Sequence, residues 1–478
     1  MSVCWDWFAW KDQFLTAEKD QLARAPELLL RLERDGVPLR AQLEDQLRDS
    51  VQSGRLGPGV PLPSSRALAR ELGVSRGVVV EAYAQLAAEG YLVSRQGAPT
   101  RVSEAASPGS APAPAHRDER PPRYDFRPGR PDVGLFPRSA WLASLRRALR
   151  TAPDSRLDYG DPRGAPELRA ALASYLGRVR GVACSPDRVI VTSGMAQGMA
   201  LFARALLASG ARRVAMEDPC SRPGREQLAT NGLTVVPVPV DSDGLVVERL
   251  DDSTDAAMVT PAHQFPLGVV LAPSRRAELV DWAARTGAIV LEDDYDAEYR
   301  YDRQPVGAVQ GLAPEQVAYA GSVSKTLAPG LRLGWLVAPE PLAAGVTQAK
   351  AADDLGTPVV EQLALADFLE RGELDRHLRR TRAIYRARRD AFVAALGRWL
   401  PECEPTGVAA GLHLVVELPS GLDEDTVLAT AWARGLGLYG MSEHRIEPGP
   451  PALLLGYGRI AEPAIEPAVR ALADSLRA

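Results

Sequence analysis

A stretch of twenty residues without any large apolar side chain divides this chain of 478 residues. From Ser103 to Pro122 the sequence reads SEAASPGSAPAPAHRDERPP, which is rich in Ala, Pro and Ser. Such a segment cannot bury a core, and its prolines keep it extended, so we interpret residues 104–122 as a linker. The linker separates an N-terminal module, residues 27–103, from a larger body, residues 123–478. Residues 1–26 fit neither part, and their role is open.

The composition excludes several classes of protein. The net charge of −5 argues against a strongly basic nucleic-acid coat, although a local basic patch is compatible with it. No apolar run reaches the roughly 18 residues of a membrane span, and the first ten residues lack the pattern of a secretory signal. The four cysteines show no CxxC spacing and the five histidines no HExxH spacing. We therefore expect a cytoplasmic protein without disulfides or a metal site.

The N-terminal module reads as three helices followed by a short hairpin. After a first helix with apolar residues at every fourth position, a second begins at Ser64 or Ser65 and ends at Gly73. A third is capped by Ser75 and closed by Gly90. Two short helices joined by a tight turn form a helix-turn-helix, whose second helix enters the major groove of DNA. Two strand-like segments within 91–102 form a wing.

The charge of this module suits DNA. Residues 55–103 contain six arginines and three acidic residues, a surplus of three positive charges in an acidic chain. Residues at the helix starts and on the wing would meet phosphates and base edges: Ser65, Arg66, Ser75, Arg76, Gly77, Arg95 and Thr100. The alternative is a helical hairpin that merely packs on the body, and periodicity alone does not separate the two.

The body alternates short apolar runs with helical patterns. Strand candidates such as RVIVTSG, RRVAMEDP, AAMVTP, GAIVLEDDYD and VAYAGSVSK are separated by helices such as the one over 274–285. This alternation predicts an α/β fold with a mostly parallel sheet covered by helices. Ligands of such sheets bind at the carboxyl ends of the strands.

Lysine is scarce, which shortens the search for a reactive amine. The chain has 4 Lys against 52 Arg, and arginine cannot lose its proton to attack a carbonyl. Lys11 and Lys19 lie in the unassigned N-terminal stretch, and Lys350 lies in a helical pattern typical of a solvated surface. Lys325 follows an apolar strand, where partial burial would ease the loss of its proton and favour a Schiff base.

Other strand ends carry complementary groups. Ser322 and Arg332 flank the lysine and suit a phosphate, and the strand–Gly–helix junction at 192–197 offers free N–H groups to one. The strand that ends in Glu292-Asp293-Asp294 needs a cation, either the protonated ring nitrogen of pyridoxal phosphate or a metal ion. No suitable His or Cys lies beside these carboxylates in the sequence, which disfavours the metal.

Both parts resemble known families. The string LPSSRALARELGVSRGVVVEAYAQLAAEGYL resembles the winged helix of GntR-type bacterial regulators, although Pro99 stands where that wing usually has Gly. The region from Tyr124 to Ala478 resembles fold-type I aminotransferases, which depend on pyridoxal phosphate. The order of winged helix, linker and aminotransferase body, together with EDDYDAEYRYD and SVSKTLAPGLRLGW, resembles the MocR/GabR-type regulators, a GntR subfamily.

The resemblance implies roles for individual residues. Lys325 matches the lysine that forms the cofactor aldimine, Asp293 the partner of the ring nitrogen, and Tyr295 the partner of the ring hydroxyl. The implied phosphate site comprises Gly194, Met195, Ala196, Ser322, Ser324 and Arg332. Tyr159 matches a tyrosine that reaches the phosphate of the neighbouring subunit, which implies a homodimer; the group's architecture makes it head-to-tail. Phe265 stands where an Asn is usual.

The chain departs from the aminotransferase pattern where a substrate carboxylate is held. Leu454 occupies the place of the usual Arg, and Arg459 lies five residues further on. Ser221 stands where related sensors of amino acids carry an aromatic residue, with Arg222 and Arg225 as possible substitutes. A missing clamp would leave the carboxylate of an amino acid unpaired.

These features lead to a functional hypothesis. We expect a transcriptional regulator, not an enzyme, that binds promoter DNA and senses pyridoxal phosphate, or a ligand that reacts with it, through Lys325. The PdxR-like members, which control vitamin B6 synthesis, are then the nearest analogue, with amino-acid metabolism as the other target. A working aminotransferase with a fused DNA-binding module is the alternative, and a structural protein with a degenerate site is disfavoured because the cofactor residues are present.

Overall fold

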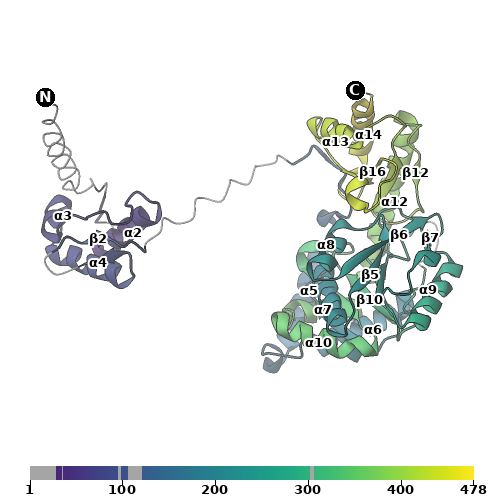
Figure 1. Cartoon of the computed structure of the whole chain (residues 1–478), viewed down its shortest axis with the longest axis horizontal. Coiled ribbons are helices and arrows are strands. Elements are labelled where there is room, and N and C mark those ends of the chain that lie inside the picture. Colours follow the sequence, from purple (N-terminus) through teal and green to yellow (C-terminus); the bar gives the residue numbers. More distant parts are fainter. Residues whose placement is uncertain are drawn as a thin grey trace, which may run out of the picture. The chain divides into compact units, whose positions relative to one another are not determined.

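The computed structural model describes residues 28, 30–34, 36–94, 98–105, 121–301 and 306–477. The chain forms two compact units, residues 1–119 and residues 120–478, which we describe one at a time (Figure 1). In the described residues, no helix is both long enough and apolar enough to cross a membrane.

The described part of the first unit consists of three helices and a small hairpin. Its core gathers the apolar stripe of the first helix and the inner faces of the other two. The Ser64 hydroxyl accepts a hydrogen bond from the Ala67 N–H and caps the second helix, which ends at Gly73 with φ +63°. Ser75 precedes the third helix as expected, but its side chain makes no capping bond. The elements are α2 (Leu39–Gln52), α3 (Ser65–Leu72), α4 (Arg76–Ala88), β1 (Leu92–Val93) and β2 (Arg101–Val102).

The second unit is built on an eight-stranded mixed sheet in the order β4-β11-β10-β9-β8-β5-β6-β7. The pairs β10–β9, β9–β8, β8–β5 and β5–β6 are parallel, whereas β11 and β7 run antiparallel to their neighbours. The predicted mostly parallel sheet is confirmed. Its strands are β4 (Val189–Thr192), β5 (Arg213–Asp218), β6 (Thr234–Asp241), β7 (Gly244–Leu245), β8 (Ala256–Val259), β9 (Ile289–Asp294), β10 (Val317–Ser322) and β11 (Gly334–Val337).

Helices cover both faces because the strands are apolar on both faces. Alternate residues of each strand point to opposite sides: Ile190 packs under α7 and α10, whereas its neighbour Val191 packs with α6. The helix predicted over 274–285 is α9, which packs on the same face as α6. The helices of this layer system are α5 (Arg138–Thr151), α6 (Pro166–Arg180), α7 (Met195–Ala208), α8 (Arg222–Thr230), α9 (Pro273–Thr286), α10 (Glu340–Asp354) and α11 (Val359–Glu370).

A smaller antiparallel sheet, in the order β12-β13-β16-β15, completes this unit with α12, α13 and α14. At the start of the unit, β3 pairs in parallel with β14, and the two form a separate two-stranded sheet. This region supplies the wall of the site that faces the carboxyl ends of the large sheet. Its elements are β3 (Tyr124–Asp125), α12 (Glu373–Trp399), β12 (Pro405–Thr406), β13 (His413–Glu417), α13 (Glu424–Ala433), β14 (Leu436–Gly437), β15 (Tyr439–Gly440), β16 (Ala452–Gly456) and α14 (Glu462–Leu476).

Candidate functional site

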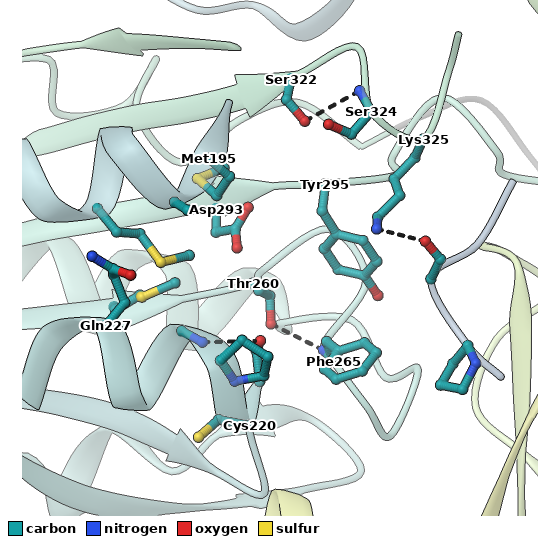
Figure 2. A pocket seen from close by; sticks show the side chains of 18 of the residues that line it. Met195, Cys220, Gln227, Thr260, Phe265, Asp293, Tyr295, Ser322, Ser324 and Lys325 are labelled. Atoms are coloured by element: carbon teal, nitrogen blue, oxygen red, sulfur yellow. Dashed lines mark hydrogen bonds between the residues drawn. The ribbon is translucent and has the colours of Figure 1, made fainter. Parts of the chain in front are cut away.

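A cavity of about 460 Å³ lies at the carboxyl ends of the parallel strands. Residues that follow β4, β5, β8, β9 and β10 line it, and Tyr439 and His444 come from the smaller sheet region. Figure 2 shows Asp293, Tyr295 and Lys325 around this cavity, with Phe265 below Tyr295 and Cys220 at the bottom of the view. The strand ends that sequence analysis singled out therefore meet in one place.

Lys325 is a partly buried amine, and among the described residues no carboxylate lies in contact with its ammonium group. Its Nζ donates to the carbonyl oxygen of Gly129 at 2.6 Å (Figure 2). Burial lowers the pKa of Lys325, opposed by the more distant charges of Asp296 and Asp293. Gly129 has φ +70°, and a Cβ there would lie 3.2 Å from Lys325 Nζ, so glycine suits this close approach. A lowered pKa makes the neutral, nucleophilic amine more accessible.

Of the three carboxylates at the end of β9, Asp293 alone lines this cavity. Alternation along the strand sends Glu292 and Asp294 to the other face, where Asp294 pairs with Arg180 at 2.6 Å. Asp293 Oδ1 is buried without a hydrogen-bond partner, and burial raises the pKa of Asp293 to about 7. An unpartnered buried carboxylate of this kind is suited to a ligand with a protonated nitrogen.

Tyr295 lies beside a histidine–aspartate pair. Its hydroxyl is 2.9 Å from His263 Nδ1, which is also 3.1 Å from both carboxylate oxygens of Asp296. Phe265, at the place where an Asn is usual, packs edge-on against the Tyr295 ring. The tyrosine hydroxyl is thus oriented toward the same cavity as Lys325 without contacting it.

The predicted phosphate residues surround the start of α7. Gly194 precedes the helix with φ +86°, and a Cβ there would lie 2.7 Å from Arg332 Nη2. Arg332 itself has φ +51°, uncommon for a side chain of this size, and donates to the Ser193 carbonyl oxygen. The first N–H groups of a helix have no partner within the helix, so this turn can receive an anion. Met195, Ala196, Ser322, Ser324 and Arg332 line the cavity.

This donor set fits pyridoxal phosphate, the cofactor of the aminotransferase fold. A partly buried amine, a buried unpartnered carboxylate and a helix start with an arginine lie around a single cavity. Each complements a different part of the cofactor: the aldehyde, the ring nitrogen and the phosphate. Among the described residues, no group of His, Cys, Asp or Glu side chains is arranged to hold a metal ion.

The place of the usual carboxylate clamp is apolar. Leu454 on β16 is fully buried in a cluster with Val415 and Met441, against which Phe265 and Tyr439 pack from the cavity side. Burial lowers the pKa of His444 at this end, and that of the nearby His413 to about 3, so both are neutral. This end of the cavity is therefore lined by aromatic rings and by the neutral imidazole of His444.

The arginines considered as substitutes are engaged elsewhere. Arg459 is 3.2 Å from Asp125, and Arg225 donates to the carbonyl oxygens of Arg445 and Glu443. Arg222 pairs with Glu226 and Glu443 on the surface, and Ser221 caps α8 while it borders the cavity. None of these three arginines lines the cavity.

Tyr159 does not reach this cavity within one chain. Its side chain is 86% exposed and borders a second hollow of about 450 Å³, formed by residues 155–161 and the loop 354–357. An exposed tyrosine in a loop rich in turns is the placement that a contact with another subunit requires.

One sequence-based expectation about the site was wrong, and several lining residues were not predicted. Lys350 is fully buried, not solvated, because its ammonium group is enclosed by Asp354 and Thr357. Sequence analysis also missed several lining residues: Pro128, Gly129, Met199, Met216, Cys220, Gln227, Met258, Thr260, Tyr439 and His444. Gly129, between prolines in RPGRP, had a local signal of close backbone approach, whereas Tyr439 and His444 depend on how the smaller sheet packs.

The predicted DNA-contacting residues lie mostly on one helix-turn-helix. Ser75, Arg76 and Gly77 are exposed at the start of α4, and Arg66 is exposed on the first turn of α3. Arg76 Nε is 3.4 Å from Ser65 Oγ, which joins the two helix starts. Thr100 bonds to the Ser94 hydroxyl within the wing. Arg95 lies outside the described residues.

Comparisons with known proteins agree with this architecture. Residues 39–102 match the family model of bacterial regulatory proteins of the GntR family, and residues 132–434 match that of aminotransferase class I and II. The chain is 34% identical to the probable rhizopine catabolism regulatory protein MocR of Rhizobium meliloti, over 94% of this chain and 96% of that protein. It is 35% identical to the pyridoxine biosynthesis transcriptional regulator PdxR of Corynebacterium glutamicum, over 88% and 92%.

The body is also similar to solved aminotransferases. Pyrococcus horikoshii kynurenine aminotransferase, in complex with PMP, superposes with a TM-score of 0.68 at 26% identity, covering 74% of this chain and 90% of that one. The winged helix and the aminotransferase-like body, joined in one chain and matched together by full-length relatives, confirm the resemblance. The chain belongs to the MocR-type regulators, the GntR-family transcriptional regulators that carry an aminotransferase class I and II domain.

Proposed function

We propose that this regulator binds promoter DNA through its winged helix and responds to pyridoxal phosphate held at Lys325. The observation that carries the proposal is that a partly buried amine and a buried unpartnered carboxylate lie around one cavity. Both groups are costly to bury in the absence of a ligand. A site that is unfavourable when empty is suited to report whether it is full.

Each of the chain's groups has a task in this proposal. Pyridoxal phosphate supplies an aldehyde that bonds to a primary amine and a ring nitrogen that takes up a proton. Lys325 provides the amine, and Asp293 holds the proton on the ring nitrogen. Tyr295, oriented by His263, donates toward the ring hydroxyl, while Arg332 and the start of α7 bind the phosphate.

The chain acts as a sensor rather than as a working aminotransferase in this proposal. Transamination requires a second substrate whose carboxylate is anchored, and Leu454 fills that place within an apolar cluster. The carboxylate of an amino acid would lose its hydration there without gaining a charged partner. The effector is then pyridoxal phosphate itself, or a reactive ligand without an α-carboxylate, and vitamin B6 or amino-acid metabolism genes are the targets.

The sensor works as a head-to-tail homodimer in the cytoplasm. Tyr159 is exposed beside a hollow of its own chain, and in a dimer it would reach the phosphate bound by the neighbouring subunit. Occupancy of the two sites would bias the placement of the two winged helices, which couples the ligand to DNA binding.

A spectroscopic titration separates the sensor from the aminotransferase. The protein loaded with pyridoxal phosphate is titrated with a panel of α-amino acids and 2-oxo acids while its visible spectrum is followed. We expect no shift at concentrations that convert an ordinary aminotransferase. A saturable shift that is lost in Arg459→Ala would show that this arginine serves as the missing anchor and would refute the sensor.

The DNA-binding half is tested by exchanging single arginines in the winged helix. Arg76→Ala should weaken promoter binding roughly tenfold and reduce the salt dependence of the affinity, because one phosphate contact is lost. Arg48→Ala is the matched control: Arg48 pairs with Glu89 at 2.9 Å inside the domain, so its loss should leave the salt dependence unchanged. Equal effects of the two changes would refute the assignment of α4 to the DNA.

A further inference from the structure

Lys350 is a fully buried ammonium group that the proposed function does not explain. It lies on the last turn of α10, with Nζ 2.5 Å from Asp354 Oδ2 and 2.9 Å from Thr357 Oγ1. A charged group is retained in a dry interior only where its partners compensate for the lost water. The ion pair with Asp354 lies within α10, and the hydrogen bond to Thr357 fastens the loop that follows this helix.

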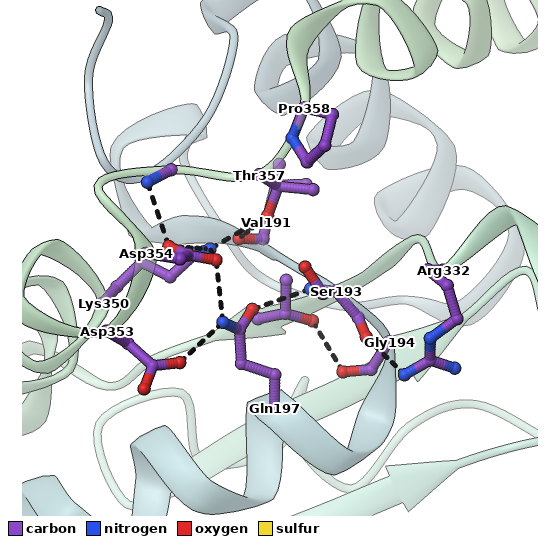
Figure 3. Close-up of polar contacts among 12 residues, drawn as sticks. Val191, Ser193, Gly194, Gln197, Arg332, Lys350, Asp353, Asp354, Thr357 and Pro358 are labelled. Carbon is purple, nitrogen blue, oxygen red and sulfur yellow. Dashed lines mark hydrogen bonds and ion pairs between the residues drawn. The ribbon is translucent and has the colours of Figure 1, made fainter. Parts of the chain in front are cut away.

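Asp354 extends this contact toward the cofactor cavity. Its Oδ2 also accepts a hydrogen bond from Gln197 Nε2 at 2.8 Å, and Gln197 Oε1 accepts one from the Ser193 N–H at 2.8 Å. Figure 3 shows this chain of contacts from Lys350 through Asp354 and Gln197 to Ser193. Because Gln197 lies on the first turn of α7, this series of contacts ends at the turn that begins that helix.

The turn from Ser193 to Met195 is consequently held from two sides. Arg332 Nη2 donates to the Ser193 carbonyl oxygen, while Gln197 accepts from the N–H of the same residue (Figure 3). The Thr192 hydroxyl donates to the Gly194 carbonyl oxygen at 3.1 Å. N–H groups bind a phosphate well only when they are already oriented toward it, so the rigidity of this turn matters for affinity.

We propose that Lys350 is a positioning residue for the cofactor phosphate: through Asp354 and Gln197 it holds the Ser193–Met195 turn in the orientation that receives the phosphate. This inference rests on the proposed function, because it assumes that pyridoxal phosphate binds at Lys325. Lys350 does not line the cavity, so its effect passes through Gln197. Without the ammonium group, Asp354 turns to solvent, and Gln197 Nε2 keeps only Asp353 Oδ2, at 2.8 Å, as an acceptor, so that its side chain is held less firmly.

The test compares two ligands that differ only in the phosphate. Dissociation constants for pyridoxal phosphate and for pyridoxal are measured by absorbance titration of the full-length apoprotein, as wild type and as Lys350→Met. We expect the variant to bind pyridoxal phosphate at least tenfold more weakly and pyridoxal within twofold of the wild type. A general loss of structure would weaken both ligands alike, so the ratio isolates the phosphate.

Two further variants complete the experiment. Gln197→Leu should reproduce the selective loss, and the double variant with Lys350→Met should add little, because both changes interrupt one chain of contacts. Thr347→Val is the matched control: Thr347 lies on α10 as Lys350 does, but its hydroxyl donates to the Ala343 carbonyl oxygen of the same helix. This control should keep the selectivity of the wild type.

Each outcome bears on a definite claim. Equal weakening of both ligands, or no weakening in either variant, overturns the role of Lys350. If Lys350→Met does not fold, the selectivity of Gln197→Leu decides the question alone. A wild-type protein that binds neither ligand at Lys325 overturns the proposed function itself, whereas a wild type that binds pyridoxal phosphate beside unaffected variants overturns only this inference.

Discussion

Lys325, which follows β10, is partly buried and Lys350, on α10, is fully buried, and their ammonium groups are held in opposite ways. Lys350 is enclosed by the carboxylate of Asp354 and the hydroxyl of Thr357. Lys325 contacts one neutral carbonyl oxygen and faces a cavity. Burial lowers the pKa of both amines, but only Lys350 has a carboxylate in contact to keep it charged. A buried charge that has a carboxylate partner stabilises the fold, whereas a charge that faces a cavity without such a partner is suited to bind a ligand.

Their carboxylates repeat the contrast. Burial alone would raise the pKa of Asp354, but the hydrogen bonds from Gln197 and Lys350 outweigh it and lower the pKa. Asp293 has no such donor on Oδ1, and burial raises its pKa to about 7. Asp354 therefore stabilises the folded apoprotein near neutral pH, whereas Asp293 destabilises it unless a cationic ligand is bound.

The largest expected difference between Lys325 and Lys350 is that only Lys325 bonds covalently to pyridoxal phosphate. Lys325→Arg should abolish the visible absorption band of the protein loaded with pyridoxal phosphate, because arginine cannot offer a neutral amine. At saturating cofactor, Lys350→Met should keep this band. Absorbance spectra of the two purified variants decide it, and the reverse pattern would exchange the roles given to the two residues.

A second prediction compares the loss of Lys350 with the loss of Asp354, its partner in the buried ion pair. Asp354→Ala should lower the free energy of unfolding by about 3 kcal/mol, since it leaves an ammonium group buried without a partner. Lys350→Met should cost only about 1 kcal/mol, because Asp354 is partly exposed and water can take over. Chemical denaturation at neutral pH measures both. The difference should shrink as pH rises, because burial lowers the pKa of the amine and an unpaired amine loses its proton in the folded state. Equal losses at all pH values would contradict the buried ion pair.

A smaller effect on stability depends on pH and concerns Asp293, which lines the cavity. With a pKa near 7 in the folded apoprotein against 3.8 as the ordinary value, Asp293 holds a proton that the unfolded chain has released. Apoprotein stability therefore falls as pH rises through this window. Asp293→Asn should make the apoprotein about 2 kcal/mol more stable at pH 8, with no difference below about pH 4, and should weaken cofactor binding. Denaturation curves at the two pH values, without and with pyridoxal phosphate, test the sign; a variant less stable than wild type at pH 8 would contradict it.

The order of elements could be predicted from sequence because their patterns are local. Alternating apolar runs and helical segments gave the parallel sheet, and Gly73 and Ser64 marked the ends of α3. The chemistry at strand ends was also predictable, because the ends of parallel strands meet at one edge. Lys325, Asp293 and Tyr295 do line one cavity.

Long-range packing could not be predicted. The sequence around Lys350 shows a polar helical pattern, and its burial depends on Asp354 and Thr357 folding back over it. The apolar cluster around Leu454 could be suspected from a missing arginine, but its contact with Phe265 joins strands distant in the chain. Tyr159 lies away from the cavity, and the contact proposed for it depends on a second subunit, which no pattern within one chain describes.

Promoter binding tests the central claim most directly. The intergenic DNA beside this chain's own gene is footprinted with the wild type and with Lys325→Ala, each with and without pyridoxal phosphate. The account predicts that pyridoxal phosphate changes the affinity or the footprint of the wild type, and that Lys325→Ala gives the cofactor-free pattern in both conditions. Identical footprints and affinities in all four cases would contradict it, because the cofactor would then not be the signal.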